Sequence, residues 1–149
     1  MMPLDSLRVN LIQTFSLPDA AVEWLLMLFQ AIQVFDDVAD DDPVNRDDLD
    51  TAIWNTLVAM PQNPFFITNW QHLLPLVASS FLKWKSSDEA ERSGRANEKS
   101  FMWRAGYYEI ILMVISLCHG PRYAIEYAEA ALNLYGENCQ DYLKEFNHA

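Results

Sequence analysis

The segment from Pro18 to Asp40 constrains the fold more than any other part of the sequence. It opens with Ser16-Leu-Pro18-Asp19, a helix start signal with a cap residue, a proline in the first turn and an acid near the positive end of the helix dipole. Apolar residues then cover most of the circumference of the predicted helix, which indicates burial on several sides. A chain of 149 residues is long enough to supply the neighbouring elements and one core.

The rest of the sequence predicts an all-α fold. The chain has only four glycines, and the apolar–polar alternation typical of strands is scarce. Helices are predicted at about residues 5–15, 18–40, 43–60, 65–85, 101–119, 121–135 and 137–146. These helices, joined by short connections, predict a compact bundle of about six to seven helices. In the third helix the residues expected to face the core are Leu49, Ile53, Leu57 and Met60.

Residues 1–149 are predicted to form a single all-α domain, within which residues 85–100 are a polar linker or arm. Six of the ten Lys and Arg residues lie between Lys83 and Arg104, so this part of the chain is locally basic. Before it, Pro75 is expected to break or kink the fourth helix. After it, Gly120-Pro121 is expected to end one helix and start the next.

The composition argues against several classes of partner. The net charge of −11 and the pI of about 4.4 disfavour binding to nucleic acid or to anionic lipid. The apolar run from Ile110 to Cys118 is too short to span a bilayer. The start of the chain lacks the basic and apolar regions of a signal peptide, and Cys118 and Cys139 fit small core residues in a reducing compartment. These features predict a cytoplasmic location.

A cluster of aspartates follows the long apolar helix. Its members, at positions i, i+1, i+4, i+5 and i+6, are Asp36, Asp37, Asp40, Asp41 and Asp42. Like charges this close repel one another, and the C-terminus of a helix disfavours anions. Either water and salt offset the repulsion, as in a solvated acidic turn, or a divalent cation does. If the cluster is a solvated turn, one of its acids has a local explanation, because Asp42 could cap a helix that begins at Pro43.

Asp36, Asp37 and Asp40 form a DDxxD motif, a spacing that suits hard cations such as Mg²⁺. The stretch Gln-Val-Phe-Asp-Asp-Val-Ala-Asp-Asp-Asp-Pro-Val-Asn-Arg resembles the first aspartate-rich motif of class I isoprenoid (trans-prenyl diphosphate) synthases. The resemblance covers about a tenth of the chain. It implies an all-helical fold, Mg²⁺ ions held by the three aspartates and a diphosphate contacted by Arg46.

The same family has a second acidic motif on a later helix. In this chain Glu137, Asp141 and Glu145 are spaced four and four apart, which is similar to the Asn-Ser-Glu triad of terpene cyclases. The resemblance therefore implies that these residues are further Mg²⁺ ligands. The spacing of the His and Cys residues does not indicate a zinc site.

The sequence leaves two classes of function open and does not decide whether the chain is an enzyme. The first is Mg²⁺-dependent binding, departure or hydrolysis of a small molecule that contains a diphosphate. A lower-ranked variant is an all-α nucleotide pyrophosphohydrolase, in which Glu126 and Glu129 would lie opposite Asp37 and Asp40. The second class is a non-catalytic helical interaction protein or homo-oligomer with a solvated acidic turn, in which surplus aromatic residues form an interface.

Overall fold

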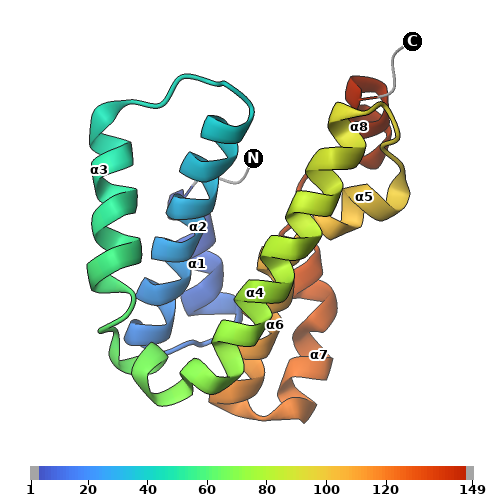
Figure 1. Cartoon of the computed structure of the whole chain (residues 1–149). Helices are drawn as coiled ribbons and strands as arrows, with labels where there is room; N and C mark the ends of the chain where they lie inside the picture. The colour runs from blue at the N-terminus through green and yellow to red at the C-terminus, as the bar shows by residue number, and fades with distance from the viewer. Residues whose placement is uncertain (1–3, 147–149) are drawn as a thin grey trace. The chain divides into compact units, whose positions relative to one another are not determined.

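A computed structural model describes residues 4–146 of the chain (Figure 1). All secondary structure in these residues is helical, so the all-α prediction is confirmed. The described part of the chain contains eight α-helices and two π-helical segments, whereas six to seven helices were expected. Within that same part, no helix combines the length and the apolar character needed to cross a membrane.

The chain divides into two compact units, and the division falls inside α4, between Trp70 and Gln71. The N-terminal unit, residues 4–70, contains the start of α4 and the elements α1 (Leu4–Val9), η1 (Asn10–Thr14), α2 (Asp19–Ala39), α3 (Arg46–Trp54) and η2 (Asn55–Ala59). The C-terminal unit, residues 71–146, contains the rest of α4 (Pro64–Arg92) and the elements α5 (Glu98–Trp103), α6 (Gly106–His119), α7 (Pro121–Leu132) and α8 (Cys139–Phe146).

Helix α2 is the centre of the N-terminal unit, as its apolar circumference predicts. It begins at Asp19, within the predicted start signal, but Pro18 is at the N-cap position rather than in the first turn and makes no side-chain cap. Nine of its apolar residues are buried. Leu7 of α1, Leu11 of η1 and Phe15, which follows η1, are fully buried. Each large apolar side chain removed from water in this way contributes about 1.5–3 kcal/mol to folding. The unit therefore has a core of its own, built around one helix.

Polar side chains on α2 fasten its neighbours in place. Arg8 of α1 forms an ion pair with Glu23 of α2. The Nε2 group of Gln30 in α2 donates a hydrogen bond to the backbone oxygen of Asp48 in α3, at 3.0 Å. Two of the polar residues along α2 thus have structural partners on α1 and α3. Figure 1 shows these helices side by side.

Asn63 and Trp24 hold the start of α4 against α2. Asn63 is buried, and its Nδ2 group donates to the backbone oxygen of Ala20 at 3.0 Å. Its Oδ1 atom accepts from the backbone N–H groups of Phe65 and Phe66, at 2.9 and 3.1 Å, and so caps α4. The ring of Trp24 stacks on that of Phe66, with centroids 5.7 Å apart and 13° between the planes.

Helix α3 starts three residues later than the sequence predicted. The expected cap was Asp42 before Pro43, which is wrong, because the cap is Asn45 and the first helical residue is Arg46. The Oδ1 atom of Asn45 accepts from the backbone N–H of Asp48 at 2.9 Å. The connection before it includes Asp41 in the left-handed region, at φ 58°. Acids do occupy the first turn of α3, as expected near the positive end of a helix dipole.

Helix α4 runs through Pro75 without a break, so the break expected there is wrong, while the alternative of a kink at Pro75 stays a prediction. A proline inside a helix removes one backbone hydrogen bond, but the neighbouring bonds keep the helix continuous. The helix also extends through the first half of the predicted polar arm and ends at Arg92. Within this half Ser87 and Asp88 are buried, and Asp88 forms ion pairs with Lys85 and Arg92 at 3.4 and 3.1 Å. Only residues 93–97 connect α4 to α5.

The single helix expected at 101–119 is two helices, α5 and α6, and this accounts for the additional element. Gly106, the first residue of α6, packs directly on Ser80 of α4. A Cβ atom at Gly106 would lie 2.7 Å from Ser80 Oγ and 2.8 Å from Ser80 Cβ. This close approach requires a glycine at the first position of α6. Helix α6 then ends at Gly120, with φ 91°, and Pro121 opens α7 as predicted.

Candidate functional site

The DDxxD aspartates lie at the C-terminal end of α2. Asp36 and Asp37 are in the last helical turn and are half-buried, whereas Asp40 is the exposed C-cap residue. The backbone N–H of Asp40 donates to the oxygen of Asp36 at 3.0 Å, and that of Asp42 donates to the oxygen of Asp37 at 2.8 Å. The carboxylates of Asp36 and Asp40 are therefore one turn apart on the chain.

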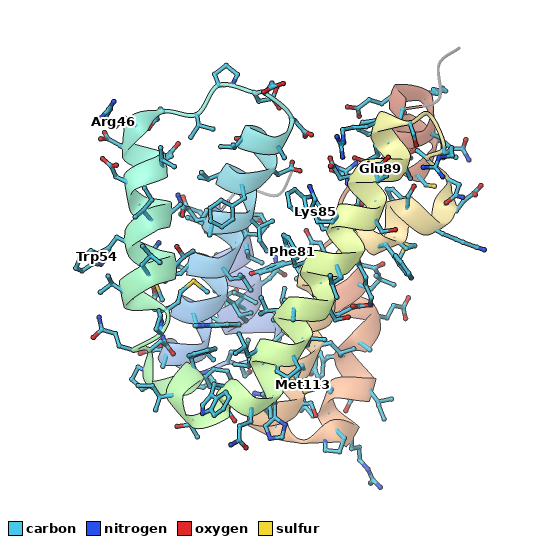
Figure 2. All side chains as sticks on the ribbon, in the orientation of Figure 1. Arg46, Trp54, Phe81, Lys85, Glu89 and Met113 are labelled. Atoms are coloured by element: carbon cyan, nitrogen blue, oxygen red, sulfur yellow. The ribbon has the colours of Figure 1, made fainter. Side chains whose placement is uncertain are left out.

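The surroundings of this motif are strongly acidic. Between residues 36 and 50 the sequence has eight aspartates and a single basic residue, Arg46. These residues come from the end of α2, the following loop and the start of α3, which lie at one end of the N-terminal unit (Figure 1). Arg46 is exposed at the start of α3, and in Figure 2 its side chain points away from α2. The resulting negative potential attracts cations to this end of the unit.

The second predicted acidic set does not lie on one helix. Helix α8 begins at Cys139, so Glu137 precedes it, and the expectation of a helix from residue 137 is wrong. The Oε2 atom of Glu137 accepts from the Tyr135 hydroxyl at 3.1 Å and lies 3.7 Å from Nη1 of Arg104. Asp141 and Glu145 are exposed on α8, one turn apart.

The predicted metal ligands belong to different units. Asp36, Asp37 and Asp40 are in the N-terminal unit, whereas Glu137, Asp141 and Glu145 are in the C-terminal unit, as is the Glu126–Glu129 pair on α7. Within residues 4–146, no group of three or more His, Cys, Asp or Glu side chains is arranged so that it could hold a metal ion. The Mg²⁺ site therefore remains a prediction from the sequence.

A hydrogen-bonded cluster in the C-terminal unit was not predicted. The Oε2 atom of Glu91 accepts from the Tyr142 hydroxyl at 2.9 Å and from Ser87 Oγ at 3.0 Å, and it lies 3.7 Å from Nη1 of Arg104. The Tyr142 hydroxyl is also 2.7 Å from Ser100 Oγ. Burial raises the pKa of the Tyr142 hydroxyl, which keeps it protonated as a donor. These bonds join α4, α5 and α8, so the cluster has a structural role.

Three of the four apolar residues predicted to face the core are instead exposed: Leu49 by 39%, Ile53 by 45% and Leu57 by 74%, whereas Met60 is half-buried. Trp54, for which the sequence made no such prediction, is 61% exposed. The fully buried residue of α3 is Ala52, and the half-buried Thr56 follows it one turn later. Small side chains let two helices approach closely, so α3 packs on α2 through this narrow side and leaves its larger apolar side chains outside.

We call this exposed surface the outer face and define it by Asp47, Asp50, Ile53, Trp54 and Leu57. All five residues are exposed. Figure 2 shows Trp54 and Arg46 near the two ends of α3, both on the side that points away from α2. An exposed tryptophan beside exposed aliphatic residues is typical of an interaction site. The sequence does show two sides of α3 that could pack on α2, one with large apolar residues and one with small residues. Considering the second side would have predicted the outer face.

The arrangement offers two features that could bind a ligand: the acidic end of the N-terminal unit and the outer face of α3 and η2. No protein-family model matches the chain, and comparisons with curated proteins and with solved structures give no significant match. A fold class alone does not identify a function. The function is therefore argued from these two features.

Proposed function

We propose that this chain is a non-catalytic helical interaction protein that binds a partner through the outer face. The observation that carries the proposal is the exposure of Trp54 and Leu57, three residues apart on one side of a helix whose other side is packed on α2. Neighbours at this spacing form one continuous patch. Tryptophan is among the residues that contribute most binding energy at protein interfaces.

The outer face is separate from the contacts that hold α3 in place. Those contacts come from Ala52, from Gln30 to the Asp48 backbone, and from the Asn45 cap. Substitutions at exposed positions usually change stability by no more than about 0.5 kcal/mol. Covering Leu57 or Trp54 with a partner would remove apolar surface from water and contribute about 1.5–3 kcal/mol for a full side chain. Substitutions on the outer face should therefore change the affinity for a partner more than the stability of the fold.

The test is a selection of amphipathic helical peptides from a random library on the wild-type protein, with counter-selection on Leu57→Asp. We expect peptides whose affinity for Leu57→Asp is lower by about tenfold or more, which corresponds to about 1.4 kcal/mol. The matched control is Ile125→Asp on α7, because Ile125 is 77% exposed and Leu57 74%. A selection that yields no binder, or binders that lose affinity equally for both variants, contradicts the proposal.

A second function has a specific observation in its favour. Asp36 and Asp37 are half-buried at the C-terminus of α2, where the helix dipole opposes negative charge, and a divalent cation would offset both effects. The alternative is that Asp36, Asp37 and Asp40 bind Mg²⁺ together with a diphosphate approached by Arg46. Under this alternative, the chain would have the isoprenoid-synthase-like fold and the activity on a diphosphate that the resemblance of the motif implies.

Calorimetric titration with Mg²⁺, with and without inorganic diphosphate, tests this second function. Saturable binding that tightens with diphosphate and is absent in Asp37→Ala is the expected result. Asp5→Ala is the control, because Asp5 is an exposed acid of the same unit outside the motif. If the wild type takes up no Mg²⁺ at millimolar concentration, or if both variants lose binding alike, the DDxxD motif is not a metal site.

A further inference from the structure

We infer that the partner of the outer face is a basic amphipathic segment, a helix with Lys or Arg at one end of an apolar stripe. This inference rests on the proposed interaction function and specifies the chemistry of its partner. Two observations support it. The first is the order of charged and apolar side chains along the outer face, and the second is the negative charge of the N-terminal unit.

The outer face begins with two acids, beside Arg46 on the same side of α3, and it ends with apolar residues. Asp47, Asp50 and Trp54 follow one another at i, i+3 and i+7, so they form one stripe along α3. Ile53 and Leu57 lie one turn apart on the adjoining stripe. A partner helix that lies along α3 therefore meets carboxylates first and large apolar side chains after about two turns.

The negative charge of the N-terminal unit favours a partner with a positive charge. Residues 4–70 contain eleven acidic residues, two arginines and no lysine. Arg8 is paired with Glu23 on α1 and α2, and Arg46 is the single basic residue among the eight aspartates of positions 36–50. A surface of this kind speeds the approach of cationic partners and repels anionic ones.

The same charges argue against a second copy of this chain as the occupant. In a parallel symmetric pair Asp47 and Asp50 would lie near their equivalents, and in an antiparallel pair they would lie against the apolar end of the other outer face. In both cases no lysine of either N-terminal unit offsets their charges. Like charges that face each other across an interface reduce the free energy of binding by several kcal/mol. A purely basic segment is also a poor fit, because it would leave Trp54 and Leu57 in water.

Three helical peptides of about 18 residues test the inference, with leucines at the same positions and Lys, Gln or Glu at the polar positions. Binding to the wild-type protein is followed by fluorescence anisotropy at two salt concentrations. We expect the Lys peptide to bind about tenfold or more tightly than the Gln peptide, and the Glu peptide to bind most weakly. The advantage of the Lys peptide should shrink at high salt, because rim charges are screened.

The variant Leu57→Asp separates docking from simple attraction between opposite charges. It adds a negative charge, so attraction alone would tighten the binding of the Lys peptide, whereas loss of the apolar contact weakens it by about tenfold. Ile125→Asp adds the same charge at a position of matched exposure and should not weaken binding. The pair Asp47→Asn/Asp50→Asn should weaken binding several-fold, and the exposed pair Glu98→Gln/Glu129→Gln should not.

The outcomes distinguish this inference from the function on which it rests. If the Gln and Lys peptides bind equally well and both require Leu57, the interaction function stands and the basic partner is wrong. If no peptide depends on Leu57, both are wrong. Light scattering of the free protein completes the test: a dimer that dissociates in Leu57→Asp identifies a second copy as the occupant and overturns the inference.

Discussion

Trp24→Ala is expected to lower the free energy of unfolding of the N-terminal unit by about 3–5 kcal/mol, the usual range for truncating a buried aromatic residue. Trp24 is almost completely buried in α2, and its ring stacks on Phe66 of α4. The change would leave a cavity and remove the stacked contact between the two helices. Urea unfolding followed by far-ultraviolet circular dichroism measures the loss through the shift of the midpoint.

Two substitutions control for this result. Trp24→Phe keeps an aromatic ring and removes an indole N–H that has no hydrogen-bond partner among the described residues, so it should cost only about 1–2 kcal/mol. Trp54→Ala removes a tryptophan that is 61% exposed and should change stability by no more than about 0.5 kcal/mol. Equal losses for Trp24→Ala and Trp54→Ala would contradict the separation of core and outer face.

Asn63→Ala is expected to cost about 1–3 kcal/mol, which is large for a substitution of a polar side chain. It removes the cap of α4 and also the partly buried bond from Asn63 to the backbone oxygen of Ala20 in α2. Loss of a cap costs about 0.5–2 kcal/mol, and loss of the further hydrogen bond costs about 0.5–1.5 kcal/mol. Thermal and urea unfolding of the purified variant would measure the sum.

The control for Asn63 is a second asparagine with the same capping role. Asn45 caps α3, but it is exposed and makes a single capping bond, so Asn45→Ala should cost about 1 kcal/mol. Asn63→Asp keeps the acceptor for the α4 backbone and loses the donor to Ala20, so its cost should fall between the two. If Asn45→Ala proves as costly as Asn63→Ala, the bond to Ala20 contributes little.

The parts of the fold that follow from local chemistry were predicted well. Helix α2 begins within Ser16-Leu-Pro18-Asp19, although Pro18 is at the N-cap position instead of in the first turn, and the step from α6 to α7 is at Gly120-Pro121 as predicted. In both places the signal and its effect are within one helical turn. The scarcity of glycine and the spacing of apolar residues were likewise enough to predict an all-α chain.

Features that depend on contacts between distant residues were not predicted. The break between α5 and α6 coincides with the packing of Gly106 on Ser80, which lies 26 positions earlier. The bonds of Glu91 to Tyr142 and to Arg104 join helices whose pairing has no signature in the sequence. Local patterns report helix formation, whereas these contacts depend on which helices meet.

For the candidate site too, the local feature was predicted and the feature that depends on packing was not. The spacing of Asp36, Asp37 and Asp40 is a local property and is present at the end of α2, while their role as Mg²⁺ ligands stays a prediction. The outer face was missed because α3 has two sides able to pack on α2. The apolar pattern favoured the side with Leu57, but the small side chain of Ala52 allowed the closer approach.

The contact between Gly106 and Ser80 also bears on ancestry. A larger side chain at either position would drive α4 and α6 apart, so descendants of a common ancestor should keep both residues small or change them together. Such a pair persists while surface residues diverge. Two small residues 26 positions apart, the second shortly before an apolar helix that ends in Gly-Pro, would therefore identify distant relatives after other similarity had been lost.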